Sequence, residues 1–313
     1  MRQAADIEDL RTEAVSRSIV DFIGNTPLIR LSKLARGIPQ DVEIYAKAEW
    51  LNPGGSVKDR AAFRMVSEAV ANGDLEKGRV IMDSSSGNTA IAYSMIGAAL
   101  GFPVTIVTPA NINLERKKTI EAFGAEIIHS DPIEGSDGAI MLAHKIKNES
   151  PDKYFMPDQY NNPLNPLAHY DTTAPEIWEQ TGGRVTHFIA GVGTSGTLMG
   201  VSRRLKEFNP EVKTLEIQPA EVLHGLEGLK HMETSIVPGI YDRGAFDGSI
   251  SISTEDSYRM MEEMVKEEGI FIGHSGGAAV CGAIEVARSI TAGVIVTVLP
   301  DSGFRYLSEK LWW

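Results

Sequence analysis

The chain has 313 residues, of which 42% are hydrophobic and 23% are charged, and this composition is typical of a soluble globular protein. Its formal net charge is −12, which repels nucleic-acid phosphates and anionic lipids, so we expect neither nucleic acid nor membrane as a partner. The single cysteine, Cys281, excludes an intramolecular disulfide, and no Cys/His spacing suggests a metal site. Residues 1–16 are acidic and lack an apolar core, so we expect no signal peptide and a cytoplasmic location.

Short β-branched runs alternate with amphipathic segments along most of the chain. The predicted strands are Val42–Ala46, Arg79–Met82, Val104–Val107, Glu126–His129, His187–Ala190, Lys213–Ile217 and Val294–Leu299. The predicted helices are Asp59–Ala71, Thr89–Leu100, Leu114–Phe123, Gly138–Asn148, Gly196–Phe208, Glu255–Glu268 and Ala278–Ser289. This alternation predicts an α/β architecture of parallel sheets flanked by helices. The Pro/Asn-rich stretch Pro157–Pro166 predicts a boundary between two halves, and the irregular stretch Pro219–Gly248 predicts a functional loop.

The stretch Asn52–Arg60 reads NPGGSVKDR. Its proline and two glycines predict a tight turn, and Ser56 is a good N-cap for a following helix. Lys58 then falls in the first helical turn, where the helix dipole and partial burial lower the pKa of an amine. A lowered pKa suits a lysine that forms a Schiff base. The alternative is an ordinary surface lysine that follows a loop.

Two more polar turns stand between a predicted strand and a predicted helix. Ser84–Thr89 (SSSGNT) predicts a carboxylate or phosphate site at a helix N-terminus, and the alternative is a polar turn with a serine N-cap. Gly191–Thr197 (GVGTSGT) predicts a nest of backbone N–H groups that binds an anion. This second turn also matches G-x-G-x-x-G, and Glu216 follows at the spacing of a dinucleotide fold. A NAD-dependent oxidoreductase is therefore an alternative.

A fourth motif, Gly273–Gly277 (GHSGG), is weak alone, because a serine at a helix start is usually an N-cap. In this order and spacing, however, the four motifs resemble those of the fold-type II pyridoxal-phosphate enzymes. Within that family they are similar to the cysteine synthases, which are O-acetylserine or O-phosphoserine sulfhydrylases. Gly24–Leu28 (GNTPL) and Pro300–Ser308 (PDSGFRYLS) are also similar to that family. The resemblance extends from about Ile19 to Ser308.

The resemblance implies an α/β fold like that of the tryptophan synthase β subunit, with two domains that each contain a mostly parallel sheet flanked by helices. We expect a small mobile domain over residues 52–160, which carries the loop for the substrate carboxylate. The large domain would comprise residues 18–51 and 161–313 and would bind the cofactor's phosphate and pyridine nitrogen. Residues 1–17 would form an N-terminal arm. The resemblance also implies a homodimer.

The resemblance further implies pyridoxal 5′-phosphate as the cofactor and a role for each motif. Lys58 would form the Schiff base with the cofactor and act as the catalytic base. Asn88 would donate a hydrogen bond to the cofactor's 3′-oxygen, and Ser275 would face the pyridine nitrogen. The residues expected to bind the cofactor phosphate are Gly193, Thr194, Ser195, Gly196 and Thr197. The residues expected to bind the substrate carboxylate are Ser85, Ser86, Thr89 and Gln159.

A serine opposite the pyridine nitrogen leaves the ring neutral, and a neutral ring is a weak electron sink that favours elimination and replacement over transamination. The resemblance therefore implies a β-replacement that makes L-cysteine or an S-substituted cysteine through an aminoacrylate intermediate. The substrates would be O-acetylserine or O-phosphoserine with sulfide or thiosulfate. The alternatives are a cystathionine β-synthase-like enzyme, a serine or threonine dehydratase, the NAD-dependent oxidoreductase, and a relative that has lost its chemistry.

The stretch Leu223–Asp242 resembles the corresponding loop of the B-type enzymes. Within it, Lys230 would face an anionic leaving group such as phosphate or an anionic sulfur donor such as thiosulfate, and the alternative is a solvated lysine on a mobile loop. The C-terminal residues Trp312 and Trp313 carry large apolar faces. We expect them to dock on the chain's own surface or on a dimer partner rather than to cover the active site.

Overall fold

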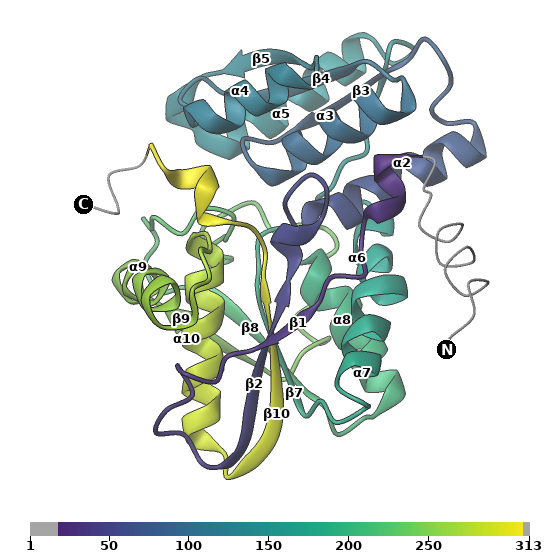
Figure 1. The fold of residues 1–313 in the computed structure, drawn as a ribbon. Coiled ribbons are helices and arrows are strands. Elements are labelled where there is room, and N and C mark those ends of the chain that lie inside the picture. Colours follow the sequence, from purple (N-terminus) through teal and green to yellow (C-terminus); the bar gives the residue numbers. More distant parts are fainter. Residues whose placement is uncertain (1–17, 309–313) are drawn as a thin grey trace, which may run out of the picture.

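The computed structural model describes residues 18–308, so the predicted arm at 1–17 and the terminal Trp312 and Trp313 lie outside the described residues (Figure 1). The strands are β1 (Leu28–Arg30), β2 (Asp41–Ala48), β3 (Val80–Ser84), β4 (Val104–Pro109), β5 (Glu126–Ser130), β6 (Tyr154–Phe155), β7 (His187–Gly191), β8 (Lys213–Pro219), β9 (Gly248–Ile252) and β10 (Ala292–Leu299). The α-helices are α2 (Lys58–Asn72), α3 (Asn88–Leu100), α4 (Leu114–Ala122), α5 (Gly135–Glu149), α6 (Leu164–Ala168), α7 (Ala174–Gln180), α8 (Gly196–Phe208), α9 (Thr254–Glu263) and α10 (His274–Ser289).

The larger sheet has six strands in the order β1-β2-β10-β7-β8-β9. Strand β1 runs antiparallel to β2, and the other neighbouring pairs are parallel. Successive side chains of a strand point to opposite faces of the sheet. In β10 both sets are buried, because Ile295 packs in one hydrophobic cluster and Val296 in another. The sheet is therefore covered on both faces, which explains why β10 is apolar along most of its length.

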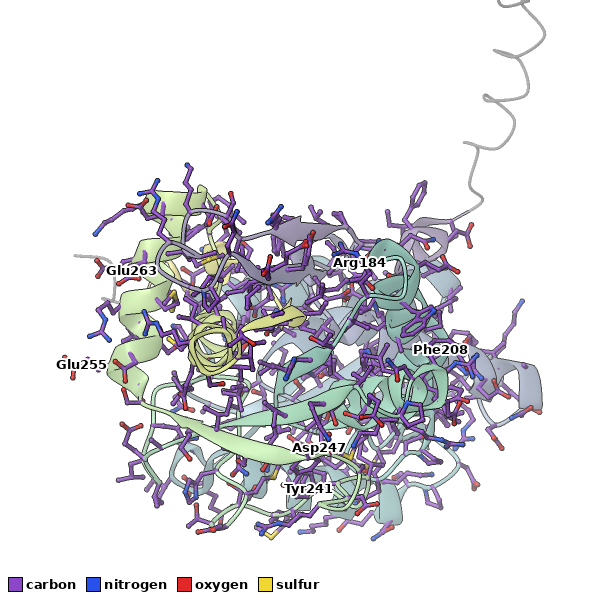
Figure 2. All side chains as sticks on the ribbon, turned by 90° about the horizontal axis from the view of Figure 1, so that it is seen from below. Arg184, Phe208, Tyr241, Asp247, Glu255 and Glu263 are labelled. Carbon is purple, nitrogen blue, oxygen red and sulfur yellow. The ribbon has the colours of Figure 1, made fainter. Side chains whose placement is uncertain are left out.

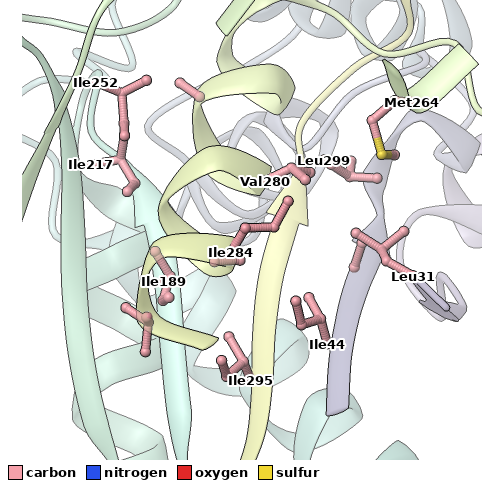
Figure 3. Packing of buried hydrophobic residues seen from close by; sticks show 14 of the residues in the cluster. Leu31, Ile44, Ile189, Ile217, Ile252, Met264, Val280, Ile284, Ile295 and Leu299 are labelled. Atoms are coloured by element: carbon pink, nitrogen blue, oxygen red, sulfur yellow. The ribbon is translucent and has the colours of Figure 1, made fainter. Parts of the chain in front are cut away.

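Helices α9 and α10 cover one face of this sheet, and α7 and α8 cover the other. Figure 3 shows Val280 of α10 in the same buried cluster as Ile295 of β10. Seen from below, Glu255 and Glu263 of α9 lie on the opposite side of the molecule from Phe208, the last residue of α8 (Figure 2). Because helices cover both faces of the sheet, a site formed by the sheet itself is expected at the ends of its strands.

The smaller sheet has four parallel strands in the order β5-β4-β3-β6 and lies above the larger one in Figure 1. On one side it packs against α3, where Tyr93 and Ile96 are fully buried. On the other side it packs against Ala139 and Ala143 of α5. The predicted fold class, mostly parallel sheets flanked by helices, is confirmed. The division into domains of 52–160 and of 18–51 with 161–313 stays a prediction.

Helix α2 lies between the two sheets and contacts both α3 and α6. Arg60, in its first turn, donates 2.8 Å hydrogen bonds to both carboxylate oxygens of Glu49. The same guanidinium donates to Glu176 of α7 at 2.6 and 2.8 Å. The start of α2, which carries Lys58, is thus fixed to the larger half of the molecule by buried ion pairs.

Some elements are absent from the predictions made from the sequence. Strands β1, β6 and β9 are missed, and the first two have only three and two residues, which is too short for a periodic signal. The helical run α6–α7 is also missed. It contains Pro166 and Pro175, which lack the N–H that a helix needs, and its middle, His169–Thr173, is π-helical. The predicted boundary Pro157–Pro166 therefore ends inside α6.

Candidate active site

A cavity of about 290 Å³ opens beside the residues that follow β3 and β7 and beside the start of α2. In parallel α/β sheets the loops that follow the strands commonly form binding sites. The predicted site residues that line this cavity are Lys58, Ser85, Ser86, Asn88, Thr89, Gln159, Gly193, Thr194 and Lys230. The predicted site residues that do not line it are Ser195, Gly196, Thr197 and Ser275.

Lys58 is the first residue of α2 and is half-buried. Burial lowers the pKa of its amine, and the nearby Asp301 carboxylate opposes this shift. The prediction that Ser56 caps the helix is wrong, because Val57 is the N-cap. Ser56 instead pairs with Asp301 in an isolated antiparallel β-bridge, and its Oγ accepts a 3.3 Å hydrogen bond from the Lys58 backbone N–H. This bridge keeps Asp301 close enough to Lys58 for its charge to act on the amine.

The polar loop after β3 is tied to Gln159. Thr89 Oγ1 donates a 2.7 Å hydrogen bond to Gln159 Oε1, and Gln159 Nε2 donates to the backbone oxygen of Ser84 at 3.1 Å. Gln159 is buried and its backbone N–H donates to Asp83 at 3.3 Å. Thr89 and Gln159 lie far apart in the sequence, so these contacts bring together two parts of the predicted carboxylate site. Ser85, which also carries a hydroxyl, lines the cavity next to them.

Asn88 is oriented by the C-terminal motif. Its side-chain amide donates a 2.7 Å hydrogen bond to Asp301 Oδ2, which also accepts a 2.7 Å bond from the Tyr306 hydroxyl. Arg305 donates to Asn88 Oδ1 and to the backbone oxygen of Gly54. The sequence singled out Pro300–Ser308 as a motif but gave no role to these residues. Their role is to hold the Asn88 amide against the start of the loop that carries Lys58.

The glycine turn after β7 is tightly packed. A side chain on Gly193 would clash with the backbone oxygen of Gly228, and one on Gly196 would clash with Asn165. Ser195, the residue directly before α8, has a left-handed backbone conformation with φ of 73°. Thr194 Oγ1 accepts a 3.1 Å hydrogen bond from Asn165 Nδ2. The N-terminus of α8, with its free N–H groups, thus follows directly after Gly193 and Thr194, which line the cavity.

Ser275 is the second residue of α10 and is buried. Its Oγ lies within 3.9 Å of the position that a Cβ on Gly228 would occupy, and Gly228 lines the cavity. Ser275 is therefore close to the cavity without lining it. The predicted N-cap alternative for this serine is wrong, because the N-cap of α10 is Gly273.

Glu216 is the residue on which the dinucleotide alternative depends. It is buried, and its carboxylate accepts a 2.5 Å hydrogen bond from Gln218 and a 2.8 Å hydrogen bond from the Tyr241 hydroxyl. A dinucleotide fold requires this acid to be open to a ribose. The structure therefore argues against the NAD-dependent alternative.

Charged residues that the sequence analysis did not assign also line the cavity. Arg116 of α4 forms an ion pair with Glu227 and stacks over the Tyr306 ring, with 4.8 Å between the guanidinium carbon and the ring centroid. Lys230, which was predicted, lies 3.6 Å from Asp137 of α5. The only signal for Arg116 in the sequence was its place near the start of a predicted helix, and that signal is common to many surface residues.

The family of pyridoxal-phosphate dependent enzymes matches residues 19–301, and the chain belongs to this family. It is 51% identical over 299 residues to the cysteine synthase of Aquifex aeolicus, covering 94% of this chain and 91% of that protein. It is 42% identical over 286 residues to cysteine synthase B of Escherichia coli, covering 91% and 93%. The solved cysteine synthase of Entamoeba histolytica is similar with a TM-score of 0.91 at 37% identity, covering 96% and 91%. The predicted family and cofactor are thereby confirmed.

The residues at the cavity fit pyridoxal phosphate. Ser195 Oγ is buried beside the N-terminus of α8 and has no hydrogen-bond partner within residues 18–308. A phosphate oxygen would satisfy this hydroxyl, and the helix N-terminus favours its negative charge. The amine that a pyridoxal aldehyde requires is present in the same cavity on Lys58. The chain therefore provides both a hydroxyl for the phosphate, on Ser195, and an amine for the aldehyde, on Lys58.

Residues 18–308 contain neither a cluster of metal-binding side chains nor a helix suited to cross a membrane. No group of three or more His, Cys, Asp or Glu residues in this part of the chain could hold a metal ion. No helix in the described ranges is both long enough and apolar enough to cross a membrane.

Proposed function

We propose that this chain makes L-cysteine, or an S-substituted cysteine, by replacing the leaving group on the β-carbon of O-acetylserine or O-phosphoserine with a sulfur nucleophile. The observation that carries the proposal is that one cavity contains the Lys58 amine, the Thr89–Gln159 pair and the glycine turn at Gly193. The cysteine synthases to which the chain is similar support the same activity.

The cofactor would be held by residues that line the cavity or lie beside it. Lys58 would bind it covalently, and Asn88 would donate to its 3′-oxygen. The five residues proposed to bind its phosphate are Gly193, Thr194, Ser195, Gly196 and Thr197. Ser275 would face the pyridine nitrogen without protonating it, because a serine hydroxyl is too weak an acid. When bound, the cofactor supplies an electron sink that makes the α-proton of an amino acid removable.

The chain's own residues would then bind the substrate and move one proton. Ser85, Ser86, Thr89 and Gln159 would bind the α-carboxylate with hydroxyl and amide donors at the N-terminus of α3. The Nζ atom of Lys58 would take the α-proton and later return it, and the lowered pKa of this amine suits it to act as a base. The bond from the β-carbon to the leaving oxygen breaks, the oxygen keeps the electron pair, and a new carbon–sulfur bond forms. No oxidant or reductant is needed.

Lys230 would bind the anionic group of O-phosphoserine or of a donor such as thiosulfate. The lysine belongs to the irregular segment after β8, and it lines the cavity together with Arg116. In an acidic protein, a cation at this place favours an anionic ligand locally.

We also propose that residues 52–160 form a small domain that moves relative to residues 18–51 and 161–313, that the protein is a homodimer, and that it works in the cytoplasm. The separate four-stranded sheet supports the first of these proposals. Light scattering of the purified protein tests the second, since a monomer mass at micromolar concentration would contradict it.

The test of the activity is a steady-state comparison of O-acetylserine, O-phosphoserine and serine, each with sulfide, thiosulfate and homocysteine. We expect cysteine from at least one activated serine with sulfide, and a shift of the visible absorption band when that serine is added. The Lys58→Ala variant is the matched control and should form no product. A wild-type protein that forms only pyruvate would show a dehydratase instead, and one that uses only homocysteine would show a cystathionine synthase.

A further inference from the structure

We propose that Arg116 is a receptor for a carboxylate carried by the sulfur nucleophile, and that Glu227 occupies this receptor until such a nucleophile binds. The inference rests on the proposed function, since it assigns part of the cavity to the second substrate. Neither Arg116 nor Glu227 takes part in the proposed cofactor binding or proton transfer. The class of nucleophile it selects is a small thiol that bears its own carboxylate, in contrast to free sulfide.

The position of Arg116 suits a receptor. Its side chain is only 6% exposed, it lines the cavity, and its Nε is buried without a hydrogen-bond partner in the described part of the chain. Stacking on the Tyr306 ring fixes the plane of the guanidinium. Tyr306 is itself held by its 2.7 Å hydrogen bond to Asp301. A rigid guanidinium with unused donors is preorganised to bind a planar carboxylate through two parallel bonds.

The position of Glu227 suits a removable partner. Its side chain is 42% exposed, and it belongs to the irregular stretch between β8 and β9. Among residues 18–308 its carboxylate forms one ion pair, to Arg116 Nη1. Moving this half-exposed carboxylate into water costs little, whereas leaving the buried guanidinium without a counter-ion costs much more. A ligand carboxylate can therefore take the place of Glu227, because Arg116 remains paired throughout the exchange.

The remaining charged groups of the cavity are already committed to other partners. The α-carboxylate of the amino substrate is assigned to the loop that contains Thr89, and the amine of Lys58 is reserved for the cofactor. Lys230, which lies 3.6 Å from Asp137, is proposed to bind the phosphate of O-phosphoserine or an inorganic donor such as thiosulfate. Arg116 is thus the cation left for a third group. In the structure the Glu227 carboxylate is paired with Arg116, so the ligand group that replaces Glu227 is expected to be a carboxylate too.

In the reaction, the thiolate sulfur forms a bond to the β-carbon, and the acetate or phosphate leaves with the electron pair of the broken carbon–oxygen bond. The carboxylate on Arg116 takes no part in bond making. Arg116 is therefore a specificity-determining residue, and its effect should appear as a choice between thiols rather than as a change common to all of them.

The kinetic test compares mercaptoacetate with its neutral counterpart 2-mercaptoethanol at saturating O-acetylserine. We expect Arg116→Gln to lower the ratio of the two kcat/KM values by about tenfold or more, and Arg116→Lys to lower it less. Glu227→Gln should raise the same ratio by about fivefold, because it empties the receptor. Glu233→Gln, which removes an exposed charge from the same segment, should leave the ratio unchanged. Equal changes with both thiols in the Arg116 and Glu227 variants would overturn the proposal.

A binding measurement separates this inference from the proposed function. The holoprotein is titrated calorimetrically with (methylthio)acetate, whose blocked sulfur cannot react. We expect tighter binding to Glu227→Gln than to the wild type and no binding to Arg116→Gln. If (methylthio)acetate binds to the variants as expected but the holoprotein makes no cysteine, the proposed function is wrong and the role of Arg116 as a carboxylate receptor is supported. If cysteine is made but Glu227→Gln binds the probe no better than the wild type, the receptor is refuted, even if Arg116→Gln does not fold.

Discussion

Lys230 is nearly buried, and its ammonium lies 3.6 Å from Asp137 and 5.0 Å from the centroid of the Tyr160 ring. If it binds a phosphate leaving group, Lys230→Ala should raise the KM for O-phosphoserine by about tenfold and hardly change the KM for O-acetylserine. The acetyl group carries no charge for the lysine to bind. Lys230→Arg should preserve most of the preference. Equal effects on both substrates, measured in steady state, would remove Lys230 from the anion site.

Asp59, next to Lys58, is fully buried. Burial raises the pKa of its carboxyl to about 7, although the Gly54 N–H, 2.6 Å from Oδ2, opposes this shift. Its Oδ1 has no hydrogen-bond partner among the described residues, which is consistent with a retained proton. Between the ordinary pKa of 3.8 and about 7, the folded state keeps a proton that the unfolded state has lost. The free energy of unfolding should therefore fall as the pH rises through this window.

The variant Asp59→Asn removes this titration. Relative to the wild type, it should gain stability between pH 5 and pH 7 at about 1 kcal/mol per pH unit, and the difference should level off above pH 7. Urea unfolding at a series of pH values with saturating pyridoxal phosphate measures it. The same substitution at exposed Asp152 controls for the loss of a charge. A difference between Asp59→Asn and wild type that does not change with pH would contradict the raised pKa.

Site residues that lie in a sequence motif could be predicted. Residues that are placed by a contact between distant parts of the chain could not. Lys58, Asn88 and Gly193 were found because glycines and hydroxyls surround them in recognisable order, and the structure brings all three to one cavity. Arg116 and Glu227 were not found, because their ion pair joins helix α4 to the segment after β8. No local pattern encodes such a pair. The roles of the predicted residues remain proposals.

At the scale of elements, α2 depends on its buried anchor. Burial alone would raise the pKa of the Glu49 carboxyl, but the Arg60 guanidinium outweighs it and holds the pKa at about 2. Arg60→Met would leave Glu49 charged and fully buried, which should cost about 3–5 kcal/mol of stability. Arg64→Met, on the same helix and 38% exposed, should cost at most about 1 kcal/mol. Urea unfolding of both variants checks this, and similar losses from the two would contradict the anchor.

The turn between β7 and α8 and the turn between β3 and α3 should respond differently to an added methyl group. Gly193→Ala would force its Cβ against the backbone oxygen of Gly228, so we expect the Kd for pyridoxal phosphate to rise about tenfold or more. Gly87→Ala meets no atom within 4 Å and should leave that Kd unchanged. Titration of each apoprotein with the cofactor, followed by absorption, gives both values. A normal Kd for Gly193→Ala would show that the turn does not bind the phosphate.

Elements with a strong repeating pattern were predicted well. Helix α8 was predicted over its full range, and β10 was predicted except for its first two residues, Ala292 and Gly293, which lack the apolar character of the rest. The helix predicted over Glu255–Glu268 is divided, because its last five residues, Met264–Glu268, form a π-helix. In a π-helix each backbone N–H bonds to the carbonyl five residues earlier instead of four, and this change gives no signal in the hydrophobic pattern. Such details are decided by tertiary packing rather than by local propensity.

For the whole molecule, the cavity is built from both sheets at once. Helix α4, which contacts the smaller sheet, provides Arg116, and the segment after β8 of the larger sheet provides Glu227 and Lys230. Asp137 of α5, beside the cavity, is the ion-pair partner of Lys230. The fold class could be predicted from the alternation of strands and helices. The strand order could not, since it places β10, near the end of the chain, between β2 and β7. That placement brings the C-terminal motif to Asn88.

The most direct test of the central claim is reduction of the holoprotein with sodium borohydride, followed by mass analysis of its peptides. We predict a pyridoxyl group on Nζ of Lys58, and none on the fully buried Lys47 or on Lys230. Lys58→Arg should carry no pyridoxyl group after the same treatment. A pyridoxyl group on a different lysine, or on none, would contradict the assignment of Lys58 as the residue that binds the cofactor.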